Sequence, residues 1–161
     1  MVQVHVAMIA VDGEGSPVLL LKPVDEARHG VVLPIWIGPM ETAAIMVASG
    51  LAEGPQRPLT YDLMVRLIEA LDGVVEKVEV THLAEGTFHA AITLQTPGGV
   101  RLIDARPSDS IALALRVGAP IFVAEAVLDE AAIPDITQDA GDTLAEFTEF
   151  IEHVDPEDFR N

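Results

Sequence analysis

The segment from Asp104 to Asp109 places an arginine, a serine and two aspartates at the junction of two predicted elements. A strand is predicted to end at Asp104, and Pro107 holds the preceding Arg106 in an extended conformation. Ser108 and Asp109 then lie in the first turn of a predicted helix, where free N–H groups and the helix dipole favour an anion. The planar guanidinium of Arg106 suits a phosphate. We therefore interpret this segment as a candidate phosphate-binding and catalytic site.

Carboxylates beside an anion site also allow metal chemistry. Asp104 and Asp109 are predicted to hold a divalent cation, Mg²⁺ or Mn²⁺, because such cations take oxygen ligands. A bound metal polarises a phosphoryl oxygen and activates water, which is the chemistry of a phosphodiesterase. The same residues allow a purely structural interpretation, in which Asp104 pairs with Arg106, Ser108 caps the helix and Asp109 complements its dipole. Spacing alone leaves both interpretations open.

A second segment repeats this pattern upstream. Arg57, Pro58, Thr60 and Asp62 place an arginine, a proline, a hydroxyl and a first-turn acid before another predicted helix. Thr60 is expected to be its N-cap. The match is short, and an internal duplication is one interpretation of it. It does supply a second arginine and carboxylate set.

Hydrophobic patterning predicts the elements that position these residues. Alternation predicts three antiparallel strands near residues 2–8, 18–21 and 31–37. Helices are predicted from Gly38-Pro39 to about residue 49, after Thr60, and from Ser108 to residue 117. In the second helix Leu63, Leu67 and Leu71 share one apolar face, and Gly73 ends it. The chain of 161 residues matches the usual size of one domain. We expect an α+β domain over residues 1–135, with an antiparallel or mixed sheet and packed helices.

A hairpin is predicted between the second and third helices, and its register bears on chemistry. A three-residue loop ending at Gly86 pairs Val80 with Ala90, so that apolar side chains of the two strands lie opposite each other. A two-residue turn would instead place His82 opposite His89 and suggest a metal pair. We expect the three-residue loop, in which the histidines point to opposite faces and are ordinary strand residues.

Composition limits the class of protein. The net charge is −17 and there is no cysteine, so disulfides and thiolate metal sites are absent. No basic stripe of the kind that follows a phosphate backbone is present, and this works against nucleic-acid binding. No apolar run approaches the roughly 18 residues of a membrane-spanning helix, and no targeting segment is recognised. We expect a cytoplasmic protein without membrane contact.

The C-terminal segment, residues 136–161, is predicted to be a separate acidic tail. Leu144, Phe147, Ile151 and Val154 form one apolar stripe, and Glu146, Glu149 and Glu152 form an acidic face. This pattern predicts an amphipathic helix that docks on the body or on a second subunit.

Several motifs together resemble the bifunctional nuclease family. They are LPIWIG at 33–38 with Glu41 after it, RPLTYDL at 57–63, GTFHA at 86–90, DARPSDSIALA at 104–114 and GAPIFV at 118–123. The resemblance covers about residues 1–135 and keeps the family's motif order. It implies a small α+β domain that forms a wedge-shaped homodimer and cleaves both DNA and RNA. Carried over by motif, the candidate site residues are Glu41, Arg57, Thr60, Asp62, Asp104, Arg106, Ser108 and Asp109.

Two hypotheses follow. The first is a nuclease that hydrolyses DNA and RNA by metal-activated water, with Asp104, Arg106, Asp109 and Glu41 as catalytic residues. Its substrate contacts would be Arg57, Thr60, Asp62 and Ser108. The second is a non-catalytic dimeric adaptor or regulatory protein that uses the same residues to hold its fold and interface. The charge favours the adaptor, and the resemblance favours the nuclease. The discriminating observation is whether Asp104, Arg106 and Asp109 converge in an open groove or pair off inside the body.

Overall fold

The computed structural model describes residues 1–28 and 30–135. Its strands are β1 Val2–Val11, β2 Pro17–Pro23, β3 Val31–Trp36, β4 Val74–Ala84, β5 Thr87–Thr96, β6 Gly99–Ala105, β7 Ile121–Val123 and β8 Ile133–Pro134. Its helices are α1 Pro39–Ala48, α2 Thr60–Ala70, α3 Pro107–Val117 and α4 Glu125–Ala131, with a single 3₁₀ turn, η1, at Glu26–Arg28. The predicted α+β class is confirmed. The predicted tail helix lies outside the described residues.

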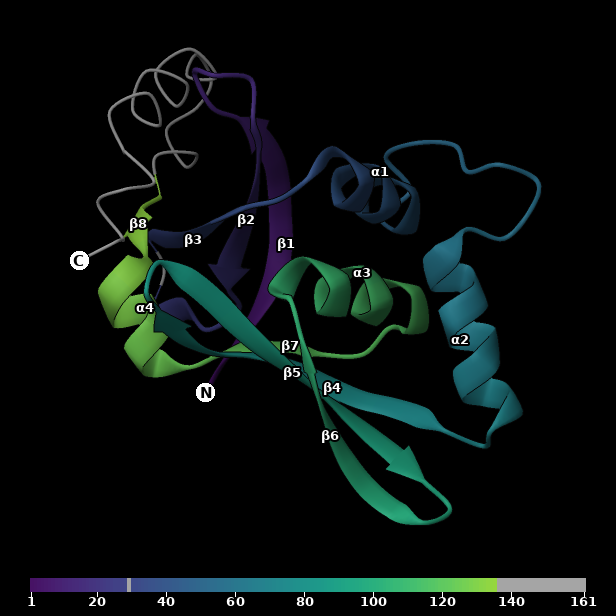
Figure 1. Cartoon of the computed structure of the whole chain (residues 1–161). Coiled ribbons are helices and arrows are strands. Elements are labelled where there is room, and N and C mark those ends of the chain that lie inside the picture. The colour runs from purple at the N-terminus through teal and green to yellow at the C-terminus, as the bar shows by residue number, and fades with distance from the viewer. Residues whose placement is uncertain (29, 136–161) are drawn as a thin grey trace.

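The eight described strands form one sheet in the order β6-β5-β4-β7-β1-β2-β3-β8. β4 and β7 run parallel, and the other neighbouring pairs run antiparallel. The sheet is therefore mixed. Two three-stranded meanders, β1-β2-β3 and β4-β5-β6, flank the short central strand β7, as Figure 1 shows. The predicted N-terminal meander is confirmed.

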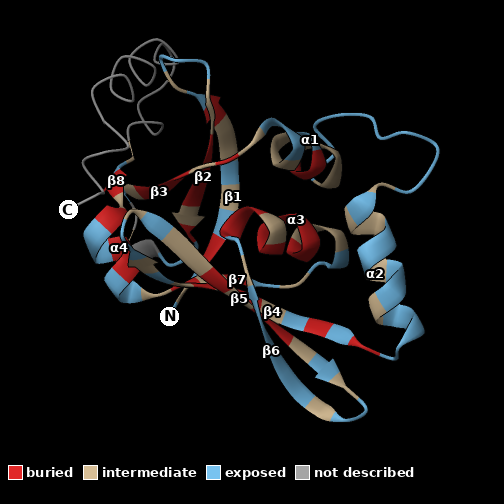
Figure 2. Ribbon diagram, viewed as in Figure 1, coloured by how far each residue is buried: buried red, intermediate tan, exposed pale blue. Residues whose placement is uncertain are grey.

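Helix α3 is the most buried of the helices in the described chain (Figure 2). Seven of its eleven residues are buried, among them the run from Ile111 to Ala114. It packs on the sheet together with α1, and its apolar side chains join those of β2, β3, β4 and β7 in the main core. A run of apolar residues that is buried on all sides explains why α3 is held firmly in place.

The sheet is strongly curved. The end of β3 and the start of β5 line one cavity, although five strand spacings separate these strands in the sheet order. In a flat sheet, five spacings of about 4.8 Å would put them roughly 24 Å apart. Twist and coiling must therefore bring the outer ends of the two meanders together. Because α1 follows β3 and α3 follows β6, the curvature also brings the first turns of these two helices together.

The hairpin of β4 and β5 confirms one part of the prediction and corrects another. Val80 pairs with Ala90 as predicted, but the connecting turn has two residues, not three. The register shift between Val80 and His82 is a β-bulge, and it compensates for the shorter turn. His82 consequently faces His89, and their rings stack with centroids 4.3 Å apart and planes 4° from parallel. The predictions of a three-residue loop and of histidines on opposite faces are wrong.

Helix α2 is the least buried of the described helices (Figure 2). Although the structure describes the whole helix, none of its residues is buried. Leu63, Leu67 and Leu71, which form the apolar face seen in the sequence, are 53%, 56% and 75% exposed. The side that packs on the core instead carries Tyr61, Val65 and Ile68.

The start of α2 also differs from the prediction. Leu59, not Thr60, is the N-cap, and Thr60 is the first helical residue. The backbone N–H of Leu59 donates to Oδ2 of Asp62 at 2.7 Å. Asp62 thus closes the helix end from within, in the way that an acidic residue at the third helical position does in a capping box.

An ion pair fastens α2 to α3. Nε of Arg116 donates to Oδ1 of Asp62 at 2.7 Å, and the side chain of Arg116 is only 7% exposed. The guanidinium also donates to the carbonyl of Ala112 and lies 5.1 Å from the centroid of the Tyr61 ring. Its Nη2 is buried and has no partner in the described chain. A cation buried this far depends on Asp62 for charge balance.

We predict that Asp62→Asn lowers the free energy of unfolding by about 2–3 kcal/mol, because it leaves Arg116 buried without its counter-charge. Chemical denaturation measures this change. The matched control is Asp129→Asn, since Asp129 pairs with Arg28 but is 67% exposed; it should cost at most about 1 kcal/mol. Equal losses in the two variants would show that the Arg116 pair does not anchor α2.

Candidate functional site

Arg106 joins the first turns of α1 and α3. Its Nη2 donates to Oε1 of Glu41 at 2.5 Å, and its Nε donates to Oδ2 of Asp109 at 2.7 Å. Nη2 also reaches Oδ1 of Asp109 at 3.1 Å. The side chain of Arg106 is 66% exposed. The Asp104–Arg106 pair predicted as one alternative is not formed in the described chain. Arg106 instead pairs with Glu41 and Asp109, at the surface and not inside the body.

Local sequence explains why these carboxylates meet one guanidinium. Gly38 is the N-cap of α1 and Arg106 is the N-cap of α3, and each helix has a proline at its first position. Glu41 and Asp109 each follow their N-cap by three residues, where an acid complements the helix dipole. The two acids thus occupy the same position in two helices whose first turns the curved sheet brings together.

Gly38 is needed for the position of Glu41. A Cβ atom at Gly38 would overlap Oε2 of Glu41, so any side chain there would displace the carboxylate. The backbone of Gly38 is extended, with φ −78°, and would itself accept another residue. The close approach of the Glu41 side chain, not backbone conformation, is what requires glycine here.

Tyr61 extends the network into α2. Its hydroxyl donates to Oδ1 of Asp109 at 2.6 Å. Burial raises the pKa of Tyr61, and its hydrogen bond to Asp109 raises the pKa further, so the hydroxyl stays protonated. Burial also raises the pKa of Asp109, but hydrogen bonds from Arg106 and Tyr61 outweigh this effect and hold the pKa below its usual value. Asp109 is therefore ionised at neutral pH.

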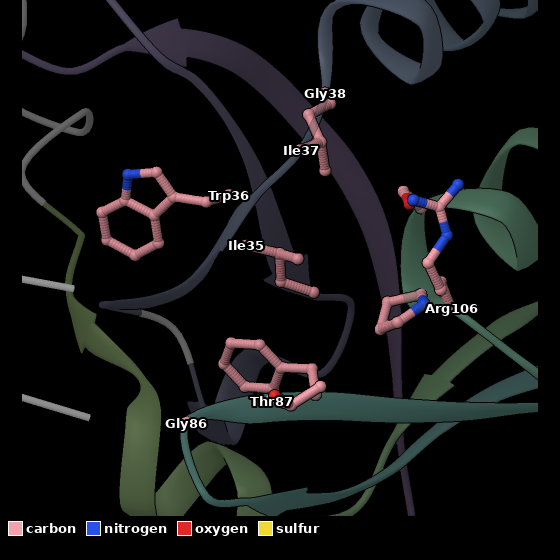
Figure 3. A pocket seen from close by; sticks show the side chains of 10 residues that line it. Ile35, Trp36, Ile37, Gly38, Gly86, Thr87 and Arg106 are labelled. Carbon is pink, nitrogen blue, oxygen red and sulfur yellow. The ribbon is translucent and has the colours of Figure 1, made fainter. Parts of the chain in front are cut away.

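A cavity of about 270 Å³ opens beside Arg106 (Figure 3). It lies between the end of β3, the start of β5 and the first turn of α3. Ser108 in its wall is 7% exposed, and its hydroxyl hydrogen-bonds to no residue in the described ranges. The first backbone N–H groups of a helix such as α3 lack helical acceptors. The residues lining the cavity are Ile35, Trp36, Ile37, Gly38, Gly86, Thr87, Phe88, Arg106, Pro107 and Ser108.

The other predicted site residues lie apart from this network. Arg57 is in the exposed loop between α1 and α2, and Thr60 is exposed at the start of α2. Asp62 pairs with Arg116, as described above. Asp104 is exposed on β6, opposite Ala91 of β5. Within the described ranges, Arg57, Thr60 and Asp104 make no hydrogen bond or ion pair with Arg106, Glu41 or Asp109. Their roles in a site stay predictions.

The carboxylates at the site are already engaged by Arg106. Both oxygens of Asp109 and Oε1 of Glu41 are hydrogen-bonded to Arg106. Over residues 1–28 and 30–135, no three His, Asp or Glu side chains are grouped so that they could hold a metal ion. As arranged, these groups do not fit a resident divalent cation, and a metal at Asp104 and Asp109 stays a prediction.

Tyr61, which belongs to this network, and Arg116, which lies over the Tyr61 ring, were not predicted as site residues. Tyr61 stands inside the RPLTYDL motif, but its hydroxyl reaches Asp109 across 48 positions of sequence, which no local pattern reveals. For Arg116, the sequence does contain a pattern from which a buried ion pair could have been predicted. It is the sole cation in a helix that is apolar almost all round, and a cation in such a place needs a carboxylate partner.

We predict that the ion pair of Asp109 with Arg106 makes the stability of the fold depend on pH in the acid range. Because the folded-state pKa of Asp109 lies below its ordinary value of about 3.9, the ionised form stabilises the fold above that value. This stabilisation is lost as the pH falls through the lowered pKa. The variant Asp109→Asn lacks this stabilisation at every pH. Its melting temperature should therefore be lower than that of the wild type at neutral pH, and it should fall less steeply than the wild-type value between about pH 5 and about pH 2.

The control for that titration is Asp104→Asn, a neighbouring carboxylate that has no partner in the described chain. Its melting temperature should follow the wild-type acid profile. If Asp109→Asn also followed the wild-type profile, the ion pair with Arg106 would make no contribution in solution.

Comparison with known proteins agrees with these motifs. A family model described as the bifunctional nuclease domain matches residues 19–135. Two uncharacterized proteins of Mycobacterium tuberculosis, from strains CDC 1551 / Oshkosh and ATCC 25618 / H37Rv, are each 43% identical to this chain over 155 residues. Each alignment covers 91% of this chain and 90% of the relative. This chain belongs to the bifunctional nuclease family.

Proposed function

We propose that this protein is a nuclease that hydrolyses phosphodiester bonds of DNA and RNA at the site around Arg106, Glu41 and Asp109. One observation carries the proposal: an exposed guanidinium, held by two carboxylates, stands at the first turn of a buried helix and on the rim of a cavity. Membership in the family supports nucleic acid as the substrate.

The proposed phosphate contact uses the side of Arg106 that its two carboxylates leave free. A guanidinium carries five N–H donors, and Nη1 of Arg106 has no partner in the described chain. The free N–H groups in the first turn of α3 add donors beside it. These donors can hold the oxygens of a phosphodiester and stabilise the charge that develops on them during attack.

The proposed nucleophile is water, and the proposed proton acceptor is Glu41. Its Oε1 is fixed by Arg106, whereas its Oε2 accepts no hydrogen bond from any described residue. A carboxylate with one oxygen fixed and one free can take a proton from an attacking water. Mg²⁺ or Mn²⁺ at Asp104 and Asp109, and substrate contacts at Arg57, Thr60 and Asp62, are kept as predictions that the assay below tests.

Charge limits the affinity of this site. Arg106 carries one positive charge against the two negative charges of Glu41 and Asp109, and the whole chain has a net charge of −17. A polyanion is therefore repelled at long range. No helix in the described chain combines the length and the apolarity that a membrane crossing requires. We propose a cytoplasmic protein that binds nucleic acid weakly.

The same pairing favours a second candidate function, a non-catalytic dimeric adaptor. In that case the ion pairs of Arg106 serve only to hold α1 against α3, and the negative charge keeps nucleic acid away. The two functions differ in what loss of one charged group does to activity and to stability.

We predict that Glu41→Gln and Asp109→Asn lose at least about 100-fold in cleavage rate, the scale of general acid–base catalysis. Their free energies of unfolding should fall by no more than about 1 kcal/mol, because the guanidinium of Arg106 in each ion pair is exposed to solvent. Arg106→Ala should lose cleavage and some stability together. Single- and double-stranded DNA and RNA are incubated with Mg²⁺, Mn²⁺ or EDTA, and melting is measured on the same preparations.

The control for charge is Arg101→Ala, which removes an exposed arginine of β6 and should keep full activity. Asp104→Asn tests the metal prediction, since activity that survives both this change and EDTA would reject it. Absence of cleavage in the wild type under every condition would leave the adaptor as the function. If Asp109→Asn kept its cleavage activity but was strongly destabilised, Asp109 would serve the fold and the catalytic site would lie elsewhere.

We also propose that the protein is a homodimer, as the family resemblance implies. The exposed apolar residues of α2 support this, because exposed apolar patches mark interaction surfaces. Light scattering after size exclusion, over a tenfold concentration range, should give twice the chain mass of 17.2 kDa. Leu67→Glu should lower that mass, whereas Val24→Glu, at an exposed position on another part of the surface, should not. A monomer at every concentration would reject the dimer.

A further inference from the structure

We propose that the cavity beside Arg106 binds a nucleobase, so that the cavity and Arg106 together hold one nucleotide of the substrate. The proposal rests on the nuclease function and adds a subsite for the base to the predicted contacts with phosphate. Four observations support it: the size of the cavity, its charge, its apolar walls and the hydroxyl of Ser108, which has no partner in the described chain.

The size fits one small planar group. The cavity volume of about 270 Å³ lies below the roughly 300–1,000 Å³ of pockets that enclose drug-sized ligands. Glycines at positions 38 and 86 contribute no side chain to the wall. The opening is thus large enough for a single ring system and too small for a folded peptide segment or several stacked bases.

The charge of the cavity differs from that of the protein. Among the ten described residues that line it, Arg106 is the one charged residue, and no carboxylate is present. This lining stands out in a chain with 26 acidic and nine basic residues. An uncharged group can enter here without meeting negative charge, while an attached phosphate stays at the rim, within reach of the guanidinium.

The walls are apolar and include one aromatic face. Figure 3 shows Ile35 on the cavity side of β3 and the indole of Trp36 on the other side of that strand. The indole nitrogen of Trp36 donates to Asp12 at 2.9 Å, outside the cavity. Phe88 is therefore the aromatic side chain available for stacking. Bases stack on aromatic rings regardless of sequence, because every base has a π-face.

The hydroxyl of Ser108 supplies a polar contact. Ser108 is 7% exposed, lines the cavity and has no hydrogen-bond partner in the described chain. A hydroxyl donates and accepts, so it can pair with an edge atom of any base. Thr87 adds a second hydroxyl-bearing side chain to the wall. With no amide or carboxylate side chain to distinguish one base from another, the subsite should tolerate all bases, which suits an enzyme that acts on DNA and RNA.

The test measures binding of mononucleotides to the full chain by NMR. Adenosine and uridine 5′-monophosphates should both shift the amide signals of Thr87, Phe88 and Ser108. Ribose 5-phosphate, which lacks the base, should bind about tenfold more weakly, as expected for the loss of one base–aromatic stack. Phe88→Leu keeps an apolar side chain and removes the ring, so it should weaken nucleotide binding to the level of ribose 5-phosphate. Phe122→Leu, the same change on β7 away from the cavity, should have no effect.

Equal affinity for nucleotides and ribose 5-phosphate would overturn the subsite, as would shifts that occur only around Arg106. Binding of N-acetylphenylalanine at these amides, with no response to nucleotides, would overturn it in favour of a peptide. Because wild-type binding decides these outcomes, they stand even if Phe88→Leu does not fold. Cleavage is measured on the same preparations. Nucleotide in the cavity without cleavage would reject the nuclease and keep the subsite, whereas cleavage without nucleotide in the cavity would do the reverse.

Discussion

The curvature of the sheet is the constraint on which the site depends. α1 leaves the sheet at the end of β3 and α3 leaves it at the end of β6, and these strands lie near opposite edges in the strand order. Only a coiled sheet brings the two helix starts close enough for one arginine to bridge them. The bridge of Arg106 to Glu41 and Asp109 then ties the outer ends of the two meanders together. The cavity beside it is enclosed by the same two ends.

The fold aligns the two halves of a possible internal duplication differently from the short sequence match between the segments at Arg57 and Arg106. Each half of the chain contains a three-stranded meander followed by a helix that begins with proline and carries an acid at its third position. On this comparison Arg106 corresponds to Gly38, and not to Arg57 as the sequence echo proposed. The two positions differ for a physical reason. Arg106 occupies the space between both acids, and a side chain at Gly38 would displace Glu41. The duplication itself stays an interpretation.

Local signals in the sequence located Arg106, Ser108 and Asp109, because a strand end, a proline and a helix start adjoin in the chain. Glu41 came from the family resemblance alone, since its meeting with Arg106 spans 65 positions and depends on sheet curvature. The hairpin error has a similar origin. The β-bulge beside Val80 permits both the apolar register and the facing histidines, whereas the sequence argument treated them as exclusive. On α2, periodicity found an apolar face but could not say which face the core would take, and the core took the side of Tyr61.

The charge balance around Arg106 decides where binding energy can come from. A phosphate that approaches Arg106 meets Glu41 and Asp109 as well, so it gains an attraction and two repulsions. An exposed ion pair is worth about 0–1 kcal/mol, and exchanging part of it for a phosphate contact is close to neutral. The site therefore has little capacity to hold a phosphodiester by charge alone. The free energy of binding must come from groups that the acids do not oppose, and the uncharged walls around Phe88 and Ser108 are the nearest. In such a site the base would supply affinity, and Arg106 would orient the phosphate.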